Sequence, residues 1–389
     1  MRTQKQKKLA FPNIPPVFRG KFPRGHVNDV KGWNFSKAEL MEAAKAGKML
    51  AMDLDMTGRP SCSLACGHCF NPVLRLMQKR GELLADADVR QVVKDAKALG
   101  LRTVKIIGPG EPLEEKTLFP FLELLAGLDI TPLIFTKGTT LGDERRTKKL
   151  FGMKPVQFAE RLKSFDVSIL FGANSFNPEL QAEIVGRNRY PGLRNRALEL
   201  LADAGFNEYM PGEATSLAII PNPVMKVNID EMFEVYKWAR RRNMYMVAAP
   251  TMVSGSCREP EAYRAITPSP EELLDLYVRI NIWAIRNNIY MLDDLERDGI
   301  SAYVGAKPCQ QVGAGPFIRR DGLVLRCPGD DVSIQGRIGE AGLAEIWKNS
   351  ENLRSYGGMI NVGCPPKEGR TIPENFFRDV LEVVKERIG

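Results

Sequence analysis

Imidazole is almost absent from this 389-residue chain, which has only two histidines, His26 and His68, beside seven cysteines. A transition-metal site with so few imidazoles must rely on thiolates, and thiolate ligands favour zinc or iron–sulfur centres. The scarcity of histidine excludes multi-histidine metal centres and directs attention to the cysteines.

Long hydrophobic runs are also missing. No apolar stretch approaches the ~18–20 residues of a membrane span, and the basic start of the chain is not followed by the apolar core of a secretory signal. We therefore expect a cytoplasmic protein, in which thiols stay reduced. Clustered cysteines in that compartment are metal ligands or redox groups rather than disulfides.

Acidic residues are rare in the first 31 positions, where eight lysines and arginines face the single acid Asp29. This tail carries most of the net charge of +8. Two interpretations stay open. The tail binds an acidic partner, such as a membrane surface, nucleic acid or an acidic peptide, or it is simply a solvated segment.

Short apolar segments alternate with amphipathic ones from residue 49 onwards. The apolar segments are continuous, as expected for strands of a parallel sheet that is covered on both faces. Six such units make either an open doubly wound sheet or a partial barrel. The pattern predicts strands at 49–56, 102–108, 131–138, 166–174, 215–221 and 244–252, with helices at 85–100, 118–128, 156–165, 191–205 and 229–243.

The alternation ends near residue 255, where we expect a domain boundary. A basic tail and a short helix capped by Ser36 (1–48) precede the α/β unit (49–255). A segment rich in glycine and cysteine (256–370), which begins with a helix at 269–288, and a C-terminal helix (371–389) follow it.

Three of the seven cysteines, Cys62, Cys66 and Cys69, lie in one loop after the first predicted strand. A four-iron cluster takes one thiolate per iron, so three cysteines would leave one iron open. A structural zinc ion needs four ligands, and His68 is available as the fourth. Because adjacent residues on a tight loop seldom reach one ion together, iron–sulfur is the favoured interpretation and zinc the alternative.

A glycine turn with a carboxylate ends the second predicted strand, in the order Gly108-Pro109-Gly110-Glu111-Pro112. Glycine lets the backbone approach a ligand closely. The carboxyl ends of parallel strands form the ligand-binding end of α/β folds. We therefore expect this turn and the cysteine loop at the same end of the sheet.

Together, the Cys-x3-Cys-x2-Cys loop and the Gly-Glu-Pro turn resemble the radical S-adenosylmethionine (SAM) superfamily. The resemblance implies an α/β fold with a partial (β/α)6 barrel and a [4Fe–4S] cluster held by Cys62, Cys66 and Cys69. Its open iron would bind SAM. Reductive cleavage of SAM would give methionine and a 5′-deoxyadenosyl radical that abstracts a hydrogen atom from a substrate.

The resemblance also implies a set of SAM-binding residues. The segment Thr136-Lys137-Gly138 resembles the family's Thr-Asn-Gly, with lysine in the central position. Residues near the adenine, the methionyl group or the ribose would be His68, Phe70, Gly108, Gly110, Glu111, Pro112, Thr136, Ser168 and Arg187.

The other four cysteines, Cys257, Cys309, Cys327 and Cys364, lie at or beyond the predicted boundary. The Asp-Gly pair between FIRR and LVLR is a strong two-residue turn signal. A hairpin at 317–326 would bring its flanking cysteines, Cys309 and Cys327, to one side. Cys364 follows a helix predicted at 342–354.

This region resembles the twitch or SPASM extension of radical SAM enzymes, which carries an auxiliary Fe–S cluster. The resemblance implies one auxiliary cluster, of the [4Fe–4S] type, held by Cys309, Cys327 and Cys364. Two interpretations of Cys257 stay open: it is the fourth ligand, or three cysteines leave one iron free for substrate.

The resemblance implies an oxidative reaction with the auxiliary cluster as electron acceptor. The substrate is either a small molecule that is dehydrogenated or a peptide that is cross-linked or oxidised. The segment before the first strand is short and irregular, which counts against a dedicated leader-binding domain. Flavodoxin or ferredoxin is the expected electron donor. A non-enzymatic zinc- or nucleic-acid-binding protein is the remaining hypothesis, and no side chain stands out as a general base.

Overall fold

One sheet of nine strands runs through the computed structural model, which describes residues 29–56, 62–70, 83–108, 110–350, 364 and 366–388. The basic tail up to residue 28 and Pro109 lie outside the described residues. The strand order is β6-β5-β4-β3-β2-β1-β7-β8-β9. The strands are β1 (Ala51–Asp55), β2 (Thr103–Gly108), β3 (Thr131–Thr136), β4 (Ser168–Gly172), β5 (Leu217–Ile220), β6 (Tyr245–Met246), β7 (Phe317–Ile318), β8 (Leu323–Cys327) and β9 (Asp330–Arg337).

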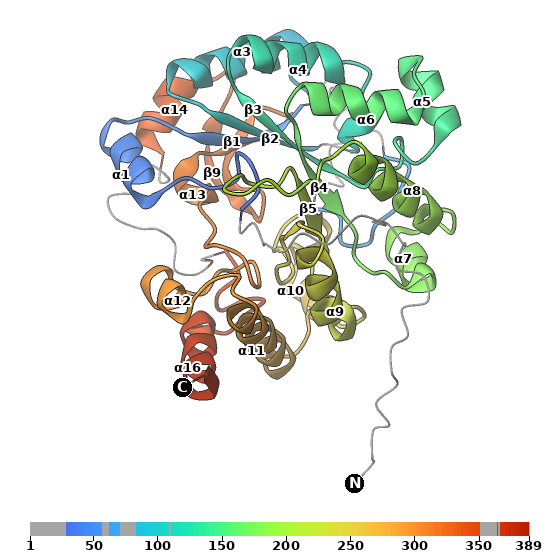
Figure 1. The fold of residues 1–389 in the computed structure, drawn as a ribbon. Coiled ribbons are helices and arrows are strands. Elements are labelled where there is room, and N and C mark those ends of the chain that lie inside the picture. The colour runs from blue at the N-terminus through green and yellow to red at the C-terminus, as the bar shows by residue number, and fades with distance from the viewer. Residues whose placement is uncertain are drawn as a thin grey trace.

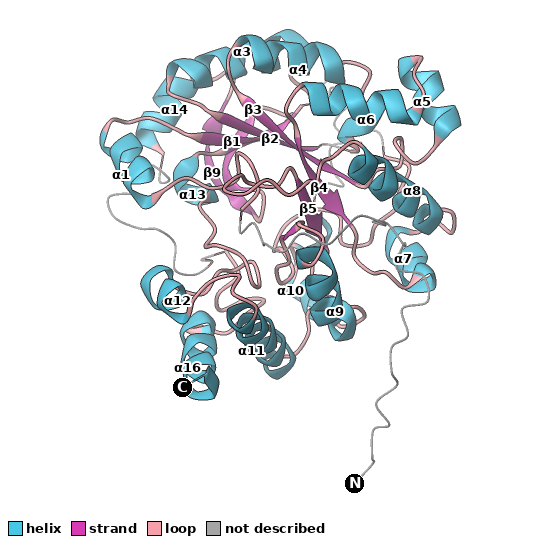
Figure 2. Cartoon of the chain, in the orientation of Figure 1, coloured by secondary structure: helices cyan, strands magenta, loops and turns pink. Residues whose placement is uncertain are grey.

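Strands β1 to β6 are parallel, and each pairs with the next one along the chain. Every residue of β1, β2 and β5 is buried. Helices cover the outside of the sheet (Figure 2). The α/β class with a parallel core is thereby confirmed. The covering helices are α3 (Asp86–Ala98), α4 (Leu118–Gly127), α5 (Glu144–Phe151), α6 (Pro155–Ser164), α7 (Pro178–Val185), α8 (Tyr190–Asp203) and α9 (Ile229–Arg240).

Two crossovers hold a pair of helices where the periodicity predicts one. Gly152 ends α5 in the left-handed conformation and Pro155 starts α6; glycine and proline favour these positions. Gly186 ends α7 in the same way. The sixth strand is also shorter than the predicted 244–252.

The C-terminal hairpin forms as predicted and joins the sheet. Strands β7 and β8 are antiparallel around the Asp321-Gly322 turn, and Gly322 has a φ of +87°. Strand β7 pairs in parallel with β1, in the register Asp53 to Phe317. The predicted extension therefore continues the sheet of the α/β unit, and a domain boundary near residue 255 stays a prediction.

Further helices complete the C-terminal part of the chain. Ser36 and Ser269 each form a capping box, at the starts of α1 and α11. Helices α11 and α16 lie side by side near the C-terminus (Figure 1). No helix in the described part of the chain combines the length and apolarity that a membrane span requires. These elements are α1 (Lys37–Lys45), α10 (Pro260–Ile266), α11 (Pro270–Arg286), α12 (Leu292–Asp298), α13 (Gln311–Ala314), α14 (Leu343–Asn349) and α16 (Phe376–Ile388).

The segment Val30–Trp33 plugs the amino ends of the parallel strands. The Lys31 amide donates to Thr215 O at 2.9 Å, and the buried Trp33 packs in one cluster with Leu133. A Cβ on Gly32, whose φ is +78°, would lie 2.8 Å from Leu133 Cδ1. Glycine is therefore needed for the segment to come this close to the sheet.

Candidate active site

All seven cysteines line one cavity of about 260 Å³ at the carboxyl ends of the strands. Most of its wall is apolar, with Phe70, Ile107 and Val247 among the lining residues. Its polar lining residues include Asp53, Glu111, Lys137, Gln311, Tyr303, His68 and Thr136. One chamber therefore collects chemistry-bearing residues that are up to 311 positions apart in the sequence (Asp53 to Cys364).

The loop with Cys62, Cys66 and Cys69 is held by its neighbours. The Ala65 amide donates to Val185 O at 2.9 Å, at the end of α7. The Ser63 hydroxyl donates to Glu114 Oε1 at 3.1 Å, so the 3-10 turn Pro112–Glu114 after β2 fixes the other side. The loop is therefore positioned by two different β/α units.

The thiolate of Cys62 is disfavoured unless a cation joins it. Burial, and then the Glu111 carboxylate, raises the pKa of the Cys62 thiol to about 12. An iron–sulfur centre supplies positive charge directly at the sulfurs. No group of three His, Cys, Asp or Glu side chains among the described residues is arranged to hold a single metal ion. A four-iron cluster binds its thiolates at separate irons, so it accommodates cysteines that are too far apart for one ion.

The carboxylate of Glu111 is held at the carboxyl ends of β2 and β3. It accepts hydrogen bonds from the Thr136 hydroxyl and from the Lys137 amide, the latter at 2.7 Å. Gly110, with a φ of +81°, makes the turn that precedes it. Burial raises the pKa of Glu111 to about 7 despite these hydrogen bonds. The carboxylate is therefore preorganised for a cationic partner that would restore its charge.

His68 is a lining residue, and it is neutral at physiological pH. Burial, with a smaller contribution from the Lys137 ammonium, lowers the pKa of His68 to about 3. An uncharged ring suits the predicted place beside the adenine, and Phe70 and Pro112 also line the cavity. These assignments stay predictions.

Lys137 is the residue whose burial the sequence pattern did not indicate. Its Nζ donates to Asn174 Oδ1 at 2.5 Å, and burial lowers its pKa while Cys66 and Glu111 oppose that shift. Gly172 makes room for it, because a Cβ there would lie 2.9 Å from Lys137 Cδ. The signal in the sequence was the departure from Thr-Asn-Gly, which places a cation near the first cysteine loop.

Cys309, Cys327 and Cys364 lie near one another and line the same cavity. Burial raises the pKa of Cys327, and the two other thiols add to that shift. The pKa of Cys364 rises to about 11, again chiefly through burial. The Cys309 thiol lies 3.7 Å from the Tyr303 hydroxyl. The three thiols are close enough to interact electrostatically, as the ligands of one cluster would be. Their role as ligands stays a prediction.

Cys257 lies next to the first cysteine loop. Burial and the neighbouring Cys69 thiol raise its pKa. The Ser256 amide donates to Cys69 O at 2.9 Å, within the 3-10 turn η2 (Gly255–Cys257). A Cβ on Gly255 would lie 2.3 Å from the backbone of Phe70. This placement favours a role beside the first loop over the predicted fourth place in the C-terminal trio.

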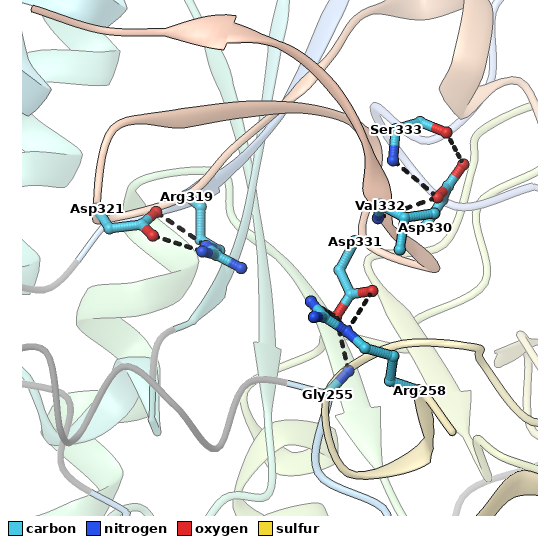
Figure 3. Close-up of polar contacts among 8 residues, drawn as sticks. All are labelled: Gly255, Arg258, Arg319, Asp321, Asp330, Asp331, Val332 and Ser333. Atoms are coloured by element: carbon cyan, nitrogen blue, oxygen red, sulfur yellow. Dashed lines mark hydrogen bonds and ion pairs between the residues drawn. The ribbon is translucent and has the colours of Figure 1, made fainter. Parts of the chain in front are cut away.

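Asp331 links the same turn to strand β9. Its carboxylate accepts from the Gly255 amide at 3.0 Å and from Arg258 Nη2 at 2.8 Å (Figure 3). Asp330 instead binds within its own strand, to the amide and hydroxyl of Ser333. A direct polar contact thus joins strand β9 to the turn that carries Cys257.

Three predicted SAM-binding residues do not line the cavity. Ser168 starts β4, and its hydroxyl donates to Lys31 O at 2.9 Å at the opposite end of the barrel. The placement argues against its predicted contact with SAM, because it lies at the amino end of a parallel strand. Gly108 and Arg187 are not among the lining residues. Arg187 comes two residues after Val185, whose carbonyl oxygen accepts the Ala65 amide of the cysteine loop.

A sequence-family comparison agrees with this geometry. Residues 58–239 match the family model described as the Radical SAM superfamily. No curated protein sequence matches the chain. The matched range begins just before the first cysteine loop and ends within α9, so it covers the helices and strands that form most of the barrel.

Solved structures of similar fold include SuiB of Streptococcus suis bound to its precursor peptide SuiA, with 15% identity and a TM-score of 0.53 over 83% of this chain and 70% of that one. SuiB bound to S-adenosylmethionine has 14% identity and a TM-score of 0.52 over the same shares. The structure of anSMEcpe with bound AdoMet has 14% identity and a TM-score of 0.56 over 87% of this chain and 92% of that one. At these identities the likeness concerns the fold.

Three thiols, a preorganised carboxylate and an uncharged imidazole line one cavity at the carboxyl ends of the parallel strands. This set fits a [4Fe–4S] cluster and SAM. The part of the chain that matches the Radical SAM superfamily, residues 58–239, holds all of these side chains.

Proposed function

We propose that this chain is a radical SAM oxidoreductase that oxidises an organic substrate inside the cavity. One observation carries the proposal: the cysteine loop of the radical SAM domain and the C-terminal trio Cys309, Cys327 and Cys364 line the same chamber. A radical made at one wall and an electron acceptor at the other would both reach a substrate between them.

The residues of the chain would hold and orient the reactants. Cys62, Cys66 and Cys69 would hold the first cluster, and Glu111 would bind the amino group of SAM. When bound, the cluster and SAM supply the 5′-deoxyadenosyl radical that removes a hydrogen atom from the substrate. The C-terminal trio would hold an auxiliary cluster that accepts the electron. Flavodoxin or ferredoxin would reduce the first cluster.

The barrel would also protect the radical. The plug Val30–Trp33 fills the amino end, and the wall of the cavity is mostly apolar. Few groups in such a wall compete with the substrate for the radical, and exclusion of water suppresses side reactions. This environment suits the dehydrogenation of a small molecule in a cytoplasmic enzyme.

A peptide is the second candidate substrate. SuiB, one of the proteins of similar fold, has been solved with a precursor peptide. The edge strand β9 exposes Val332 and Ile334, which offer apolar contacts at the rim of the sheet. The chemistry at the carbon that reacts would be the same for both substrate classes.

Isotope transfer tests the proposal. Protein purified without oxygen and loaded with iron and sulfide is incubated with SAM, a reductant and two probes: a cyclitol and a seryl peptide, each deuterated at the carbinol carbon. The proposal predicts deuterium in 5′-deoxyadenosine from one probe. A chain that binds one zinc ion and forms no 5′-deoxyadenosine would instead support the non-enzymatic hypothesis.

A further inference from the structure

A buried aspartate of β1, Asp53, lines the cavity. Asp53 is 4% exposed and lines the chamber, and its Oδ1 has no hydrogen-bond partner among the residues that the structure describes. Buried polar atoms in proteins are nearly always hydrogen-bonded, so each exception asks for an explanation. A purely structural aspartate would bind a backbone amide or a cation. Asp53 instead lines the cavity in which a substrate would lie.

The groups around Asp53 leave it without a fixed ion pair. Lys105 occupies the paired position on β2. Its Nζ donates to Gln311 Oε1 at 2.8 Å and lies 4.4 Å from the centre of the Trp33 ring. The Lys105 ammonium group therefore binds Gln311 of α13 and packs on Trp33 of the segment Val30–Trp33. Tyr303 is a further titratable group that interacts with Asp53.

Aromatic rings surround this part of the chamber. The Trp33 ring lies 5.9 Å from Tyr303 and 6.1 Å from Phe135, centre to centre. Tyr303 interacts with both Asp53 and Cys309. Asp53 and the C-terminal trio therefore share a neighbouring side chain.

The apolar surroundings also tune the carboxyl group. Burial raises the pKa of Asp53 to about 7, and the charge of Lys105 reduces the shift without cancelling it. A carboxylate with a pKa near the working pH is effective as a general base. The position of Asp53 in the cavity and its raised pKa therefore both suit a general base.

From these observations we infer that Asp53 is the catalytic base that accepts the proton of a hydroxyl or amine group on the substrate carbon that is oxidised. The inference rests on the proposed oxidation. Conversion of a carbinol to a carbonyl removes a hydrogen atom from carbon, one electron, and one proton from oxygen. The 5′-deoxyadenosyl radical would take the first, an auxiliary Fe–S cluster held by the C-terminal trio would take the second, and the carboxylate of Asp53 would take the third.

The first test needs no substrate. Infrared difference spectra between pH 5.5 and 8.5 are recorded on cluster-loaded protein labelled with ¹³C at the aspartate carboxyl carbons, which separates Asp53 from Glu111. The inference predicts a protonated-aspartate band that disappears with a midpoint near pH 7. Asp53→Asn should lack this band, and Asp321→Asn, which removes another buried carboxylate outside the cavity, should keep it. A band that persists in Asp53→Asn, or no band in the wild type, would overturn the inference.

The second test uses whichever deuterated probe transfers its label to 5′-deoxyadenosine. Asp53→Asn should keep deuterium transfer but lower the yield of oxidised product per 5′-deoxyadenosine by about 100-fold, the usual scale of general-base catalysis. Asp53→Glu should recover part of the yield, and Asp321→Asn should match the wild type. An unchanged product yield in Asp53→Asn would contradict the base, while absence of 5′-deoxyadenosine from the wild type would contradict the oxidation itself.

Discussion

Asp331 and Arg258 form a two-point ion pair between the edge strand β9 and the turn that carries Cys257. The carboxylate is 9% exposed and the guanidinium 49%. The same carboxylate accepts the Gly255 amide. One side chain of strand β9 thus fixes a turn that lies against the first cysteine loop.

Asp331→Asn should loosen this junction. The substitution removes the charge and leaves the contact with Arg258 weaker, so we expect a loss of about 1–2 kcal/mol in the free energy of unfolding. Denaturant unfolding under anaerobic conditions measures it. Glu340→Gln is the matched control, because the exposed pair of Glu340 with Arg337 should contribute at most about 0.5 kcal/mol. Equal effects of the two substitutions would contradict the role of Asp331.

Gly255→Ala should damage the first cluster site. Gly255 has a φ of +56°, and a Cβ there would lie 2.3 Å from Phe70 C and 2.5 Å from Cys69 O. The cysteine loop would have to move, so we expect a loss of about 2–4 kcal/mol in stability and less iron per chain. Gly192→Ala in α8 is the control, since no atom lies within 4 Å of its added Cβ. Full iron loading of Gly255→Ala would show that the loop adapts.

Binding of SAM should depend on pH through Glu111. Only the ionised carboxylate pairs with the ammonium group of SAM, and burial raises the pKa of Glu111 to about 7 in the free protein. The affinity should therefore fall as the pH drops below 7, by at most about tenfold per pH unit. Equilibrium binding from pH 5.5 to 8.5 measures this dependence. Glu111→Gln should bind SAM weakly at every pH; tight binding by that variant would exclude the proposed contact.

Asp53→Asn should become more stable than the wild type as the pH rises. The folded protein holds the Asp53 proton up to a pKa of about 7, whereas the unfolded chain loses it near the ordinary value of 3.8. Between these values the folded state binds more protons, so the wild type loses stability with increasing pH. Asparagine avoids this loss. Thermal unfolding should show no advantage of the variant at pH 4 and an advantage on the order of 3 kcal/mol at pH 8; a constant difference would contradict a buried, protonated Asp53.

Short-range patterns predicted the parts of the site that lie on one loop. The spacing of Cys62, Cys66 and Cys69 is local, and so is the Asp321-Gly322 turn, because the physical requirement is met within a few residues. The six parallel strands were predictable for a similar reason, since continuous apolar runs follow from burial on both faces.

Longer-range features depended on how distant segments come together. Strand β1 holds two aspartates, Asp53 and Asp55, and only the folded structure shows that Asp53 lines the chamber. Trp33 lies in an irregular segment whose path no periodicity indicates. Ser168 was expected near SAM, but the strand starts at this residue and places it at the amino end. The sequence left open whether Cys257 joins the C-terminal trio as a fourth ligand, and only the path of its turn shows that it lies beside Cys69.

Iron content and SAM cleavage, measured together on three proteins, test the central claim most directly. The wild type, purified without oxygen, should hold about eight irons per chain, as two four-iron clusters require, and should form 5′-deoxyadenosine after reduction. Cys69→Ala should form none, whereas Cys327→Ala should lose about half the iron and still cleave SAM without oxidising a substrate. Formation of 5′-deoxyadenosine by Cys69→Ala would contradict the account.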